Sequence, residues 1–356
     1  MIPLYGHDQL RHRFDAAVER GALPGSLLLH GPRGVGKQRL GLWLAQRLLC
    51  SGSGRRPCGV CEQCRFAVEL THPDLHWFFP RPRLKDGEAS ASEIREDHAE
   101  AVAERAVHNG IYPPSAGMDG IFIATTQQIV QSAAMSPAMA QRKVYVIGDA
   151  ERMVPQTGAD QSANAFLKLL EEPPVDTTIV LTSSEPGALL PTVRSRVVAF
   201  RVPPLSDSAV RQVVSDPAMQ HALRDQGFDG SVDDLVLAAA GSPGRLLAHE
   251  AWSQALRQAH RFIEAASGSD RSSRYEVALG QGVSRARGAF SDTLDAVATL
   301  LHERARAASV RRDEAAAVGA ARAVLAVERA KEQAEGNLNP QLVSAALLRQ
   351  LSGLLQ

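Results

Sequence analysis

The sequence predicts an α/β fold built on a parallel sheet, followed by a chain that is helical to its end. Three observations lead to this prediction. Short apolar runs alternate with helical patterns from residue 7 to residue 202, and such alternation is typical of a parallel sheet covered on both faces. A glycine-rich loop stands between the first apolar run and the helix that follows it. Beyond the "PPL" at 203–205 the strand patterns fade.

Each element has its own pattern. Residues 7–20 carry Leu10, Phe14 and Val18 at helical spacing. Four apolar runs bounded by turn signals predict buried strands, at 26–30, 143–150, 177–184 and 197–202. Further helices are predicted at 38–49, 125–135 and 162–172. Pro173 and Pro174 end the last of these helices.

Two regions differ from this regular pattern. Residues 80–120 are polar, with Pro and Gly at both ends and an acidic middle, and we interpret them as a solvated surface insertion with room for one helix. Beyond residue 205 the chain reads as helices, with candidate boundaries near Pro204 and Glu250. Residues 251–356 are rich in Ala, Leu and Arg.

The bulk composition bounds the class of protein. The 356 residues are enough for two or three domains, and 44% of them are apolar. Lys plus Arg and Asp plus Glu both number 39, which excludes a generally basic coat, so contact with nucleic acid requires a local patch or an assembly. No apolar stretch reaches the roughly 18 residues of a membrane span, and no secretory signal opens the chain. We therefore expect a cytoplasmic protein with four reduced cysteines.

The loop "GPRGVGK" (31–37) has the spacing of a nucleotide phosphate-binding loop. Backbone N–H groups around Gly31, Gly34 and Gly36 would wrap a phosphate, and Lys37 would reach the β- and γ-phosphates of ATP or ADP. A chance Gly-rich turn is the alternative, which the order strand, loop, helix disfavours. Gln38 stands where the pattern requires a Ser or Thr hydroxyl for Mg²⁺.

The second requirement of an ATPase is acidic residues at the end of a neighbouring strand. The candidate strand is "KVYVIGDAERM", where an ATPase would carry Asp-Glu directly after the apolar run. Here the pair is Gly148-Asp149. Because this pair and Gln38 both weaken the magnesium site, we expect a loop that binds phosphate but hydrolyses ATP weakly or not at all.

The cysteines are grouped in one short segment, "CSGSGRRPCGVCEQC". Two overlapping C-x-x-C steps let four thiolates converge on one ion, which describes a structural tetrahedral zinc site. An iron–sulfur cluster and a redox pair are the less favoured alternatives. The predicted ligands are Cys50, Cys58, Cys61 and Cys64.

Taken in order, these motifs resemble one family. The phosphate loop, the four-cysteine module, "HPD", "KVYVIGDAERM", "SANAFLKLLEEPP", "TSSEPGALLPTVRSR" and "GSPGRLL" are similar to the clamp-loader subunits of bacterial DNA polymerase III. The resemblance covers about residues 4–250. Gln38, Gly148-Asp149 and the absence of a long extension after residue 356 favour the delta-prime branch over the gamma/tau motor branch.

The resemblance implies a role for Arg196. The family's trans-acting arginine finger lies in a Ser-Arg-Cys motif, which here reads Ser195-Arg196-Val197. Arg196 would then reach ATP bound in an adjacent motor subunit and stabilise charge on the transferred phosphoryl group. A surface salt bridge is the alternative.

The family's other nucleotide-site positions are weaker here. Thr182 or Ser183 falls at the polar sensor position, and Arg245 is displaced by one residue from the second sensor arginine. Glu171 and Glu172 face either the neighbouring subunit or solvent.

The fold implied by the resemblance is an AAA+ (P-loop NTPase-like) α/β domain at 1–203, with a zinc module at 50–64 and the insertion at 80–120. A helical lid at 204–250 and an all-α collar at 251–356 would follow. The implied partners are gamma/tau and delta subunits in a hetero-pentameric ring, and through it the sliding clamp and primer–template DNA. A hydrolysing gamma/tau-type motor and an unrelated AAA+ replication or repair regulator remain the alternatives.

Overall fold

The computed structural model describes residues 1–84, 89–113, 119–153, 160–228, 230–268, 270–281, 289–335 and 338–355. The chain divides into two compact units, Met1–Leu247 and Ala248–Gln356. Among the described residues, no helix is both long and apolar enough to cross a lipid bilayer.

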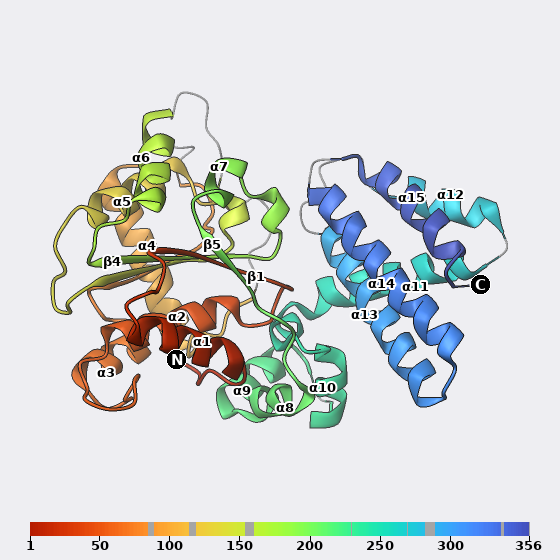
Figure 1. Cartoon of the computed structure of the whole chain (residues 1–356), viewed down its shortest axis with the longest axis horizontal. Coiled ribbons are helices and arrows are strands. Elements are labelled where there is room, and N and C mark those ends of the chain that lie inside the picture. Colours follow the sequence, from red (N-terminus) through yellow and green to blue (C-terminus); the bar gives the residue numbers. More distant parts are fainter. Residues whose placement is uncertain are drawn as a thin grey trace. The chain divides into compact units, whose positions relative to one another are not determined.

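A five-stranded parallel sheet forms the centre of the first unit (Figure 1). Its spatial order is β2-β3-β4-β1-β5. The strands are β1 (Ser26–His30), β2 (Leu75–Phe78), β3 (Lys143–Ile147), β4 (Thr177–Ser183) and β5 (Val198–Arg201). Four of them confirm the predicted strands. The edge strand β2 was not predicted, because its run "LHWF" is short and follows the "HPD" turn without an alternating pattern.

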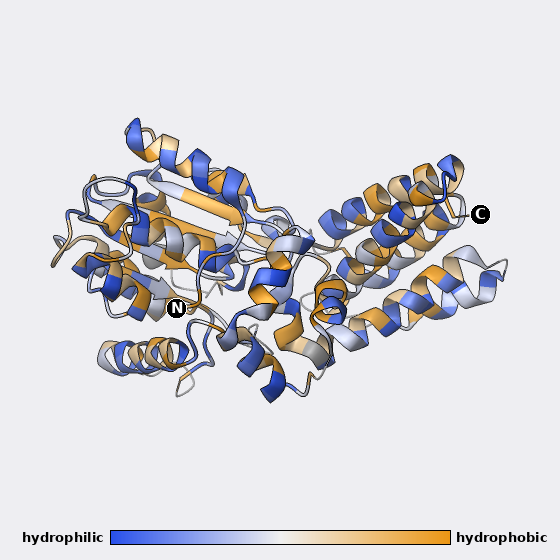
Figure 2. Cartoon of the chain, turned by 90° about the horizontal axis from the view of Figure 1, so that it is seen from below, coloured by the Kyte–Doolittle hydropathy of each residue, from blue (hydrophilic) through white to orange (hydrophobic). Residues whose placement is uncertain are grey.

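Helices cover both faces of the sheet (Figure 1), and successive strand residues supply the two cores. Leu27 and Leu29 of β1 pack into one apolar cluster with α1 (Asp8–Glu19) and α2 (Lys37–Leu49). Leu28 packs into the other cluster, with α5 (Ile123–Ala133) and α6 (Asp160–Glu171). This is the two-residue period of a strand buried on both sides. The strands are accordingly among the most apolar segments in Figure 2, while the helices carry apolar and polar stripes.

Helices α1, α2, α5 and α6 confirm the predicted helical patterns, whereas α3 (Glu62–Glu69) and α7 (Pro191–Arg194) were not predicted. The 3-10 turn η2 (Ala150–Arg152) follows β3, and η3 (Pro186–Ala188) follows β4. The helices are α1 (Asp8–Glu19), α2 (Lys37–Leu49), α3 (Glu62–Glu69), α4 (Ala91–Val107), α5 (Ile123–Ala133), α6 (Asp160–Glu171) and α7 (Pro191–Arg194).

The insertion at 80–120 holds one helix, α4, as the sequence allowed, but the solvated-loop interpretation is wrong for its described part. Ala101 of α4 is buried in the α1–α2 core. The ring of His98 stacks on Phe78 with centroids 4.4 Å apart. The guanidinium of Arg105 lies 3.2 Å from the centre of the Phe79 ring. A largely polar helix thus packs through three inward side chains, which a composition argument does not detect.

A small helical bundle completes the first unit. It contains α8 (Asp207–Ser215), α9 (Pro217–Asp225), α10 (Val232–Ala239) and the 3-10 segment η4 (Pro243–Ala248). Its core is separate from the two cores of the sheet and includes Leu205, Val210, Leu223 and Leu246. Three of its helices begin at side-chain caps, Ser206, Asp216 and Ser231.

The second unit is all helical. Its members are α11 (His249–Ser267), α12 (Arg271–Leu279), α13 (Ala289–Val310), α14 (Glu314–Glu335) and α15 (Pro340–Ser352). Their apolar faces enclose one core that includes Phe262, Leu294, Val327 and Leu347. Lys331 and Asp295 form an ion pair at 2.5 Å between α14 and α13.

Candidate nucleotide and metal sites

The phosphate-loop motif has the local structure that its sequence predicts. The loop joins the end of β1 to the start of α2, and Gly36 caps α2 with a left-handed φ of 95°. Gly34 also has a positive φ, of 79°. The predicted binding residues are therefore brought together at the carboxyl-terminal edge of the sheet, where parallel α/β folds hold ligands.

The lysine of the loop is turned back onto the protein. Nζ of Lys37 donates to the carbonyl oxygens of Gly31 and Pro32, both at 2.9 Å, and to the hydroxyl of Ser184 at 2.8 Å. The side chain is buried. The ammonium group thus ties the loop to the end of β4.

Gln38, which stands at the sequence position of the expected magnesium ligand, packs inside the protein. Its Oε1 accepts a hydrogen bond from Nε1 of Trp77 at 2.9 Å, and the residue is 8% exposed. A Cβ added to Gly148 would lie 2.4 Å from the carboxamide of Gln38. No side chain at position 148 fits while this carboxamide stays in place. Sequence reasoning identified Gln38 and Gly148 separately but missed Trp77, which lies on the unpredicted strand β2.

Two hydrogen bonds hold the segment that follows β3 to the end of β4. The backbone N–H of Asp149 donates to Oγ1 of Thr182 at 3.2 Å, so the expected sensor residue fixes the end of β3. Oε1 of Glu151 accepts from the backbone N–H of Ser184 at 2.9 Å. Burial, with the nearby charges of Asp149 and Glu185, raises the pKa of Glu151 to about 7.

The small bundle packs directly on the phosphate loop. The backbone N–H of Gly244 donates to the carbonyl of Gly34 at 2.9 Å. A Cβ on Gly34 would lie 2.6 Å from the backbone nitrogen of Arg245. Arg245, the displaced sensor arginine, is 7% exposed. Its main chain therefore lies against the loop at the point where a phosphate would be wrapped.

Arg196 lies apart from the phosphate loop, just after α7. Its Nε donates to Oε2 of Glu171 at 2.9 Å, and its Nη1 donates to the carbonyl of Thr192 at 2.9 Å. The side chain is 30% exposed. The arginine is thus accessible at the surface and forms the surface salt bridge that the sequence left open, with Glu171 as its partner.

The four cysteines converge as their spacing predicted. Their Sγ atoms all lie within 4.8 Å of one another. The Sγ atoms of Cys50 and Cys61 are 3.9 Å apart, and those of Cys58 and Cys64 are 4.0 Å apart. Four metal–sulfur bonds of about 2.3 Å in a tetrahedron would place the sulfurs about 3.8 Å apart, close to these values. The distances are far too long for disulfides, which need about 2.05 Å.

Backbone hydrogen bonds support the same cluster. The N–H groups of Cys58, Cys61 and Cys64 each point at the sulfur of the preceding cysteine in the set, at 3.4 Å. A Cβ on Gly52 would lie 2.7 Å from Sγ of Cys58. The segment is therefore closed tightly around the four sulfurs, which suits a thiolate-rich metal site. His72 is not part of it, because Nδ1 accepts from the backbone of Asp74 and Nε2 donates to Oε1 of Gln63.

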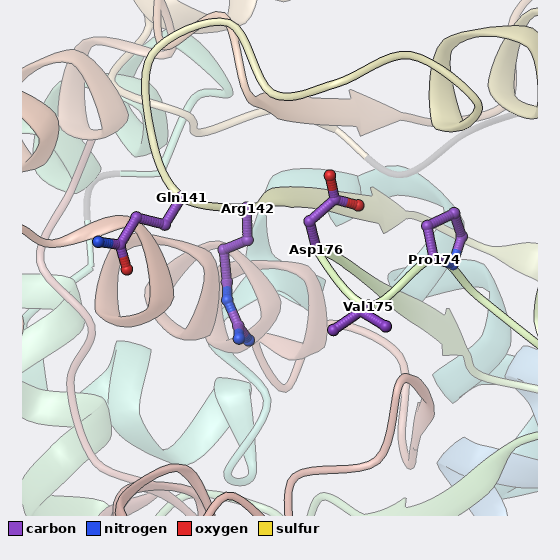
Figure 3. A pocket seen from close by; sticks show the side chains of 5 residues that line it. All are labelled: Gln141, Arg142, Pro174, Val175 and Asp176. Carbon is purple, nitrogen blue, oxygen red and sulfur yellow. The ribbon is translucent and has the colours of Figure 1, made fainter.

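A shallow hollow lies at the opposite, amino-terminal edge of the sheet (Figure 3). It has a volume of about 500 Å³ and is lined by Gln141, Arg142, Pro174, Val175 and Asp176. The side chains of Arg142 and Asp176 point in different directions in Figure 3. No set of polar groups converges in it, so it is a weaker candidate than the two sites above.

Comparison with known proteins identifies the family. A sequence model described as "DNA polymerase III, delta subunit" matches residues 6–206, a segment that spans the whole sheet and both candidate sites. The chain belongs to this family. A delta' subunit of DNA polymerase III from Pseudomonas aeruginosa is 31% identical over 217 residues, which cover 61% of this chain and 52% of that protein.

Other members of the DNA polymerase III group are also similar. The delta' subunit of Bacillus subtilis is 27% identical over 58% of this chain and 51% of its own length. The gamma/tau subunit of Mycobacterium tuberculosis is 27% identical over 67% of this chain and 34% of its own length. The chain thus spans about half the length of the delta' relatives that it matches.

Among solved structures, a gamma subunit-related protein of DNA polymerase III from Thermotoga maritima aligns with 96% of this chain and 99% of its own. Its TM-score is 0.34 at 17% identity. A RuvB variant from Thermotoga maritima aligns with 71% of this chain and 62% of its own, with a TM-score of 0.35 at 14% identity.

Proposed function

We propose that this chain is a delta-prime-type subunit of a DNA polymerase III clamp loader that does not itself hydrolyse ATP at a useful rate. It would have a mainly structural role in the loader ring and would contribute Arg196 to the ATP site of an adjacent subunit. The observation that carries the first part is the packing of the Gln38 carboxamide against Gly148, at the two sequence positions where a hydrolysing loop would carry its Mg²⁺ ligands.

The chemical reason is that this chain lacks the side chains that hold Mg²⁺ in hydrolysing enzymes of this type. In hydrolysing P-loop enzymes a hydroxyl after the loop lysine and an acid at the end of a neighbouring strand hold Mg²⁺, which neutralises charge on the β- and γ-phosphates. Here the first position carries Gln38, a neutral carboxamide hydrogen-bonded to Trp77, and the second position is Gly148, which has no side chain. ATP or ADP bound at this loop would also have to displace the main-chain contact between Gly34 and Gly244.

The proposed contribution to hydrolysis in the complex is Arg196. An arginine supplied from a neighbouring subunit stabilises the transition state of phosphoryl transfer and increases the rate by about 10³–10⁵. Arg196 is accessible and follows the short helix α7 directly after its cap residue Ser195. In the complex, Arg196→Ala should abolish most of the ATP turnover stimulated by DNA and clamp. Unchanged turnover would show that the arginine does not act in trans.

The four cysteines are proposed to bind one structural Zn²⁺. The near-tetrahedral spacing of the sulfurs and the backbone N–H groups directed at them support this ion. All four ligand positions are taken by thiolates, so the metal would stabilise the segment between α2 and α3 and take no part in catalysis. Zinc measured at one equivalent per chain is the expected result.

The proposed architecture follows the family. An AAA+ domain at about 1–203, a lid at about 204–250 and a collar at about 251–356 would join gamma/tau and delta subunits in a five-membered ring in the cytoplasm. That ring would load the sliding clamp onto primer–template DNA. The separate core of α8–α10 and the all-helical second unit support these assignments. Co-purification without gamma/tau or delta would favour an unrelated regulator.

The second candidate is a hydrolysing motor subunit of the gamma/tau type. The intact strand, loop and helix of the phosphate site and the similarity to gamma/tau subunits favour it. ATP turnover by the purified chain alone separates the two. We expect no turnover above background with Mg²⁺, and no change on Lys37→Ala. Turnover at about 1 s⁻¹ or more that Lys37→Ala abolishes would identify a motor.

A further inference from the structure

Arg196 is held by residues from two separate elements. Glu171 is the last residue of α6, and its Oε2 accepts from Nε of Arg196 at 2.9 Å. On the other side, Nη1 donates to the carbonyl of Thr192 at 2.9 Å and to Oγ of Ser195 at 3.3 Å. Among the residues that the structure describes, Nη2 has no hydrogen-bond partner. The guanidinium is thus held through Nε and Nη1, and its Nη2 group is left to bind a ligand.

The ion pair between Arg196 and Glu171 is formed through a single N–H group of the guanidinium. A carboxylate that pairs with arginine in the bidentate manner occupies two parallel N–H groups and competes with any phosphate for them. Here one carboxylate oxygen contacts Nε alone, and Nη1 is bonded to Thr192 and Ser195, which leaves Nη2 available to an oxygen of a ligand. Because Glu171 is 58% exposed, the contact adds little to the stability of the fold.

We propose that Glu171 is a positioning residue that orients Arg196 toward a triphosphate in the adjacent subunit. This inference rests on the proposed trans role of Arg196. An arginine side chain has several rotatable bonds, and holding Nε and Nη1 restricts them before the subunits meet. Catalysis by a charged group depends steeply on its placement relative to the reacting phosphoryl group. Glu171 thus acts on the rate through Arg196 and does not touch the nucleotide.

The opposite role for the same contact is a latch that withholds Arg196 until the ring closes. The two roles differ in sign. Removing a support lowers turnover, whereas removing a latch raises the basal turnover of the complex.

The test uses the whole loader, reconstituted from this chain, its cognate gamma/tau and delta subunits, the sliding clamp and primer–template DNA. Glu171→Ala should lower the DNA-stimulated kcat for ATP by about 3- to 30-fold, the range expected for a misplaced rather than a missing group. KM for ATP and the melting temperature of the free chain should stay unchanged. Glu171→Gln keeps the accepting oxygen and should restore kcat to within about threefold of the unaltered complex.

Glu172→Ala is the matched control, because Glu172 is the adjacent exposed acid, and its complex should turn over ATP normally. Arg196→Ala separates the two levels of the proposal. If Arg196→Ala lowers kcat and Glu171→Ala does not, the positioning role is wrong while the trans arginine stands. If Arg196→Ala has no effect, both fall. Faster turnover with Glu171→Ala would overturn positioning in favour of the latch.

Discussion

The carboxamide of Gln38 occupies the space that a side chain at position 148 would need. A Cβ on Gly148 would lie 2.4 Å from Cδ, Nε2 and Oε1 of Gln38, well inside any tolerated separation. A side chain at position 148 would therefore require the Gln38 carboxamide to leave its hydrogen bond with Trp77. The two departures from an ATPase pattern are thus in direct contact.

This dependence predicts strong coupling between the two positions. Gly148→Ala alone should destabilise the protein, because the new methyl group collides with a buried amide that Trp77 holds in place. In a Gln38→Ala background the same substitution should cost little. We expect a coupling free energy of about 1–3 kcal/mol from the four unfolding midpoints in urea.

Gly230→Ala is the control for this cycle, since its added Cβ would meet its nearest heavy atom at an ordinary 3.5 Å. Additive effects of Gln38→Ala and Gly148→Ala would mean that the two residues do not share this space.

The predictable part of the fold was the part with periodic patterns. Strand β1 and helix α2 followed directly from an apolar run, a glycine loop and a helical repeat. The strand β2 was missed because four residues carry no period, and only its pairing with β3 defines it. The packing of α4 was missed for another reason: its inward side chains are His98 and Arg105, which composition assigns to the surface.

The candidate nucleotide and metal sites were likewise predictable only in part from the sequence. Residue types at 38 and 148 predicted a weakened metal site, and the cysteine spacing predicted a convergent cluster. The sequence did not reveal that Lys37 bonds to its own loop, because the acceptors are main-chain carbonyls and a serine at the end of another strand. It also did not pair Arg196 with Glu171, since 25 residues separate them.

The aromatic surroundings of Arg105 predict that this residue stabilises the first unit. Its guanidinium lies 3.2, 3.6 and 4.7 Å from the ring centres of Phe79, Tyr112 and Trp77. Burial lowers the pKa of Arg105 to about 10, which keeps it charged at neutral pH. Arg105→Ala should lower the free energy of unfolding by about 2 kcal/mol through lost packing and cation–π contacts.

Two further variants separate the effect of packing from that of the charge and supply a control on the same helix. Arg105→Met keeps most of the apolar stem, so it should retain part of the stability if packing contributes and little if the cation dominates. Arg95→Ala, at an exposed position of the same helix, should change stability by less than about 0.5 kcal/mol. An Arg105→Ala protein as stable as the original would show that the rings do not depend on the cation.

The buried carboxyl of Glu151 predicts a pH dependence of stability. Its pKa is about 7 in the folded protein and 4.5 in the reference state, so the folded chain binds more protons between these values. The contribution of this group to the free energy of unfolding is therefore greatest below about pH 4.5. It decreases as the pH rises and is smallest above about pH 7. Glu151→Gln should remove this slope and raise stability at pH 8 by about 1–3 kcal/mol.

The measurement is urea unfolding at several values between pH 5 and 8. Glu172→Gln, at an exposed acid, should leave the slope as it is. A Glu151→Gln protein with the original pH dependence would assign that slope to other groups.

Removal of metal predicts a loss of stability that starts at the cysteine segment. Cys50 ends α2 and Cys64 lies buried in α3, so the ion would hold together two helices that pack on the same core. A strong chelator should release one zinc per chain, detected with a colorimetric indicator, and lower the melting temperature by at least about 5 °C.

Two variants test the assignment of this loss to the cysteine cluster. Cys64→Ser should reproduce the loss. Val60→Ser, on a side chain that is 79% exposed between two ligands, should retain the zinc and the stability. Iron with a visible chromophore, or a metal-free chain of unchanged stability, would contradict a structural zinc.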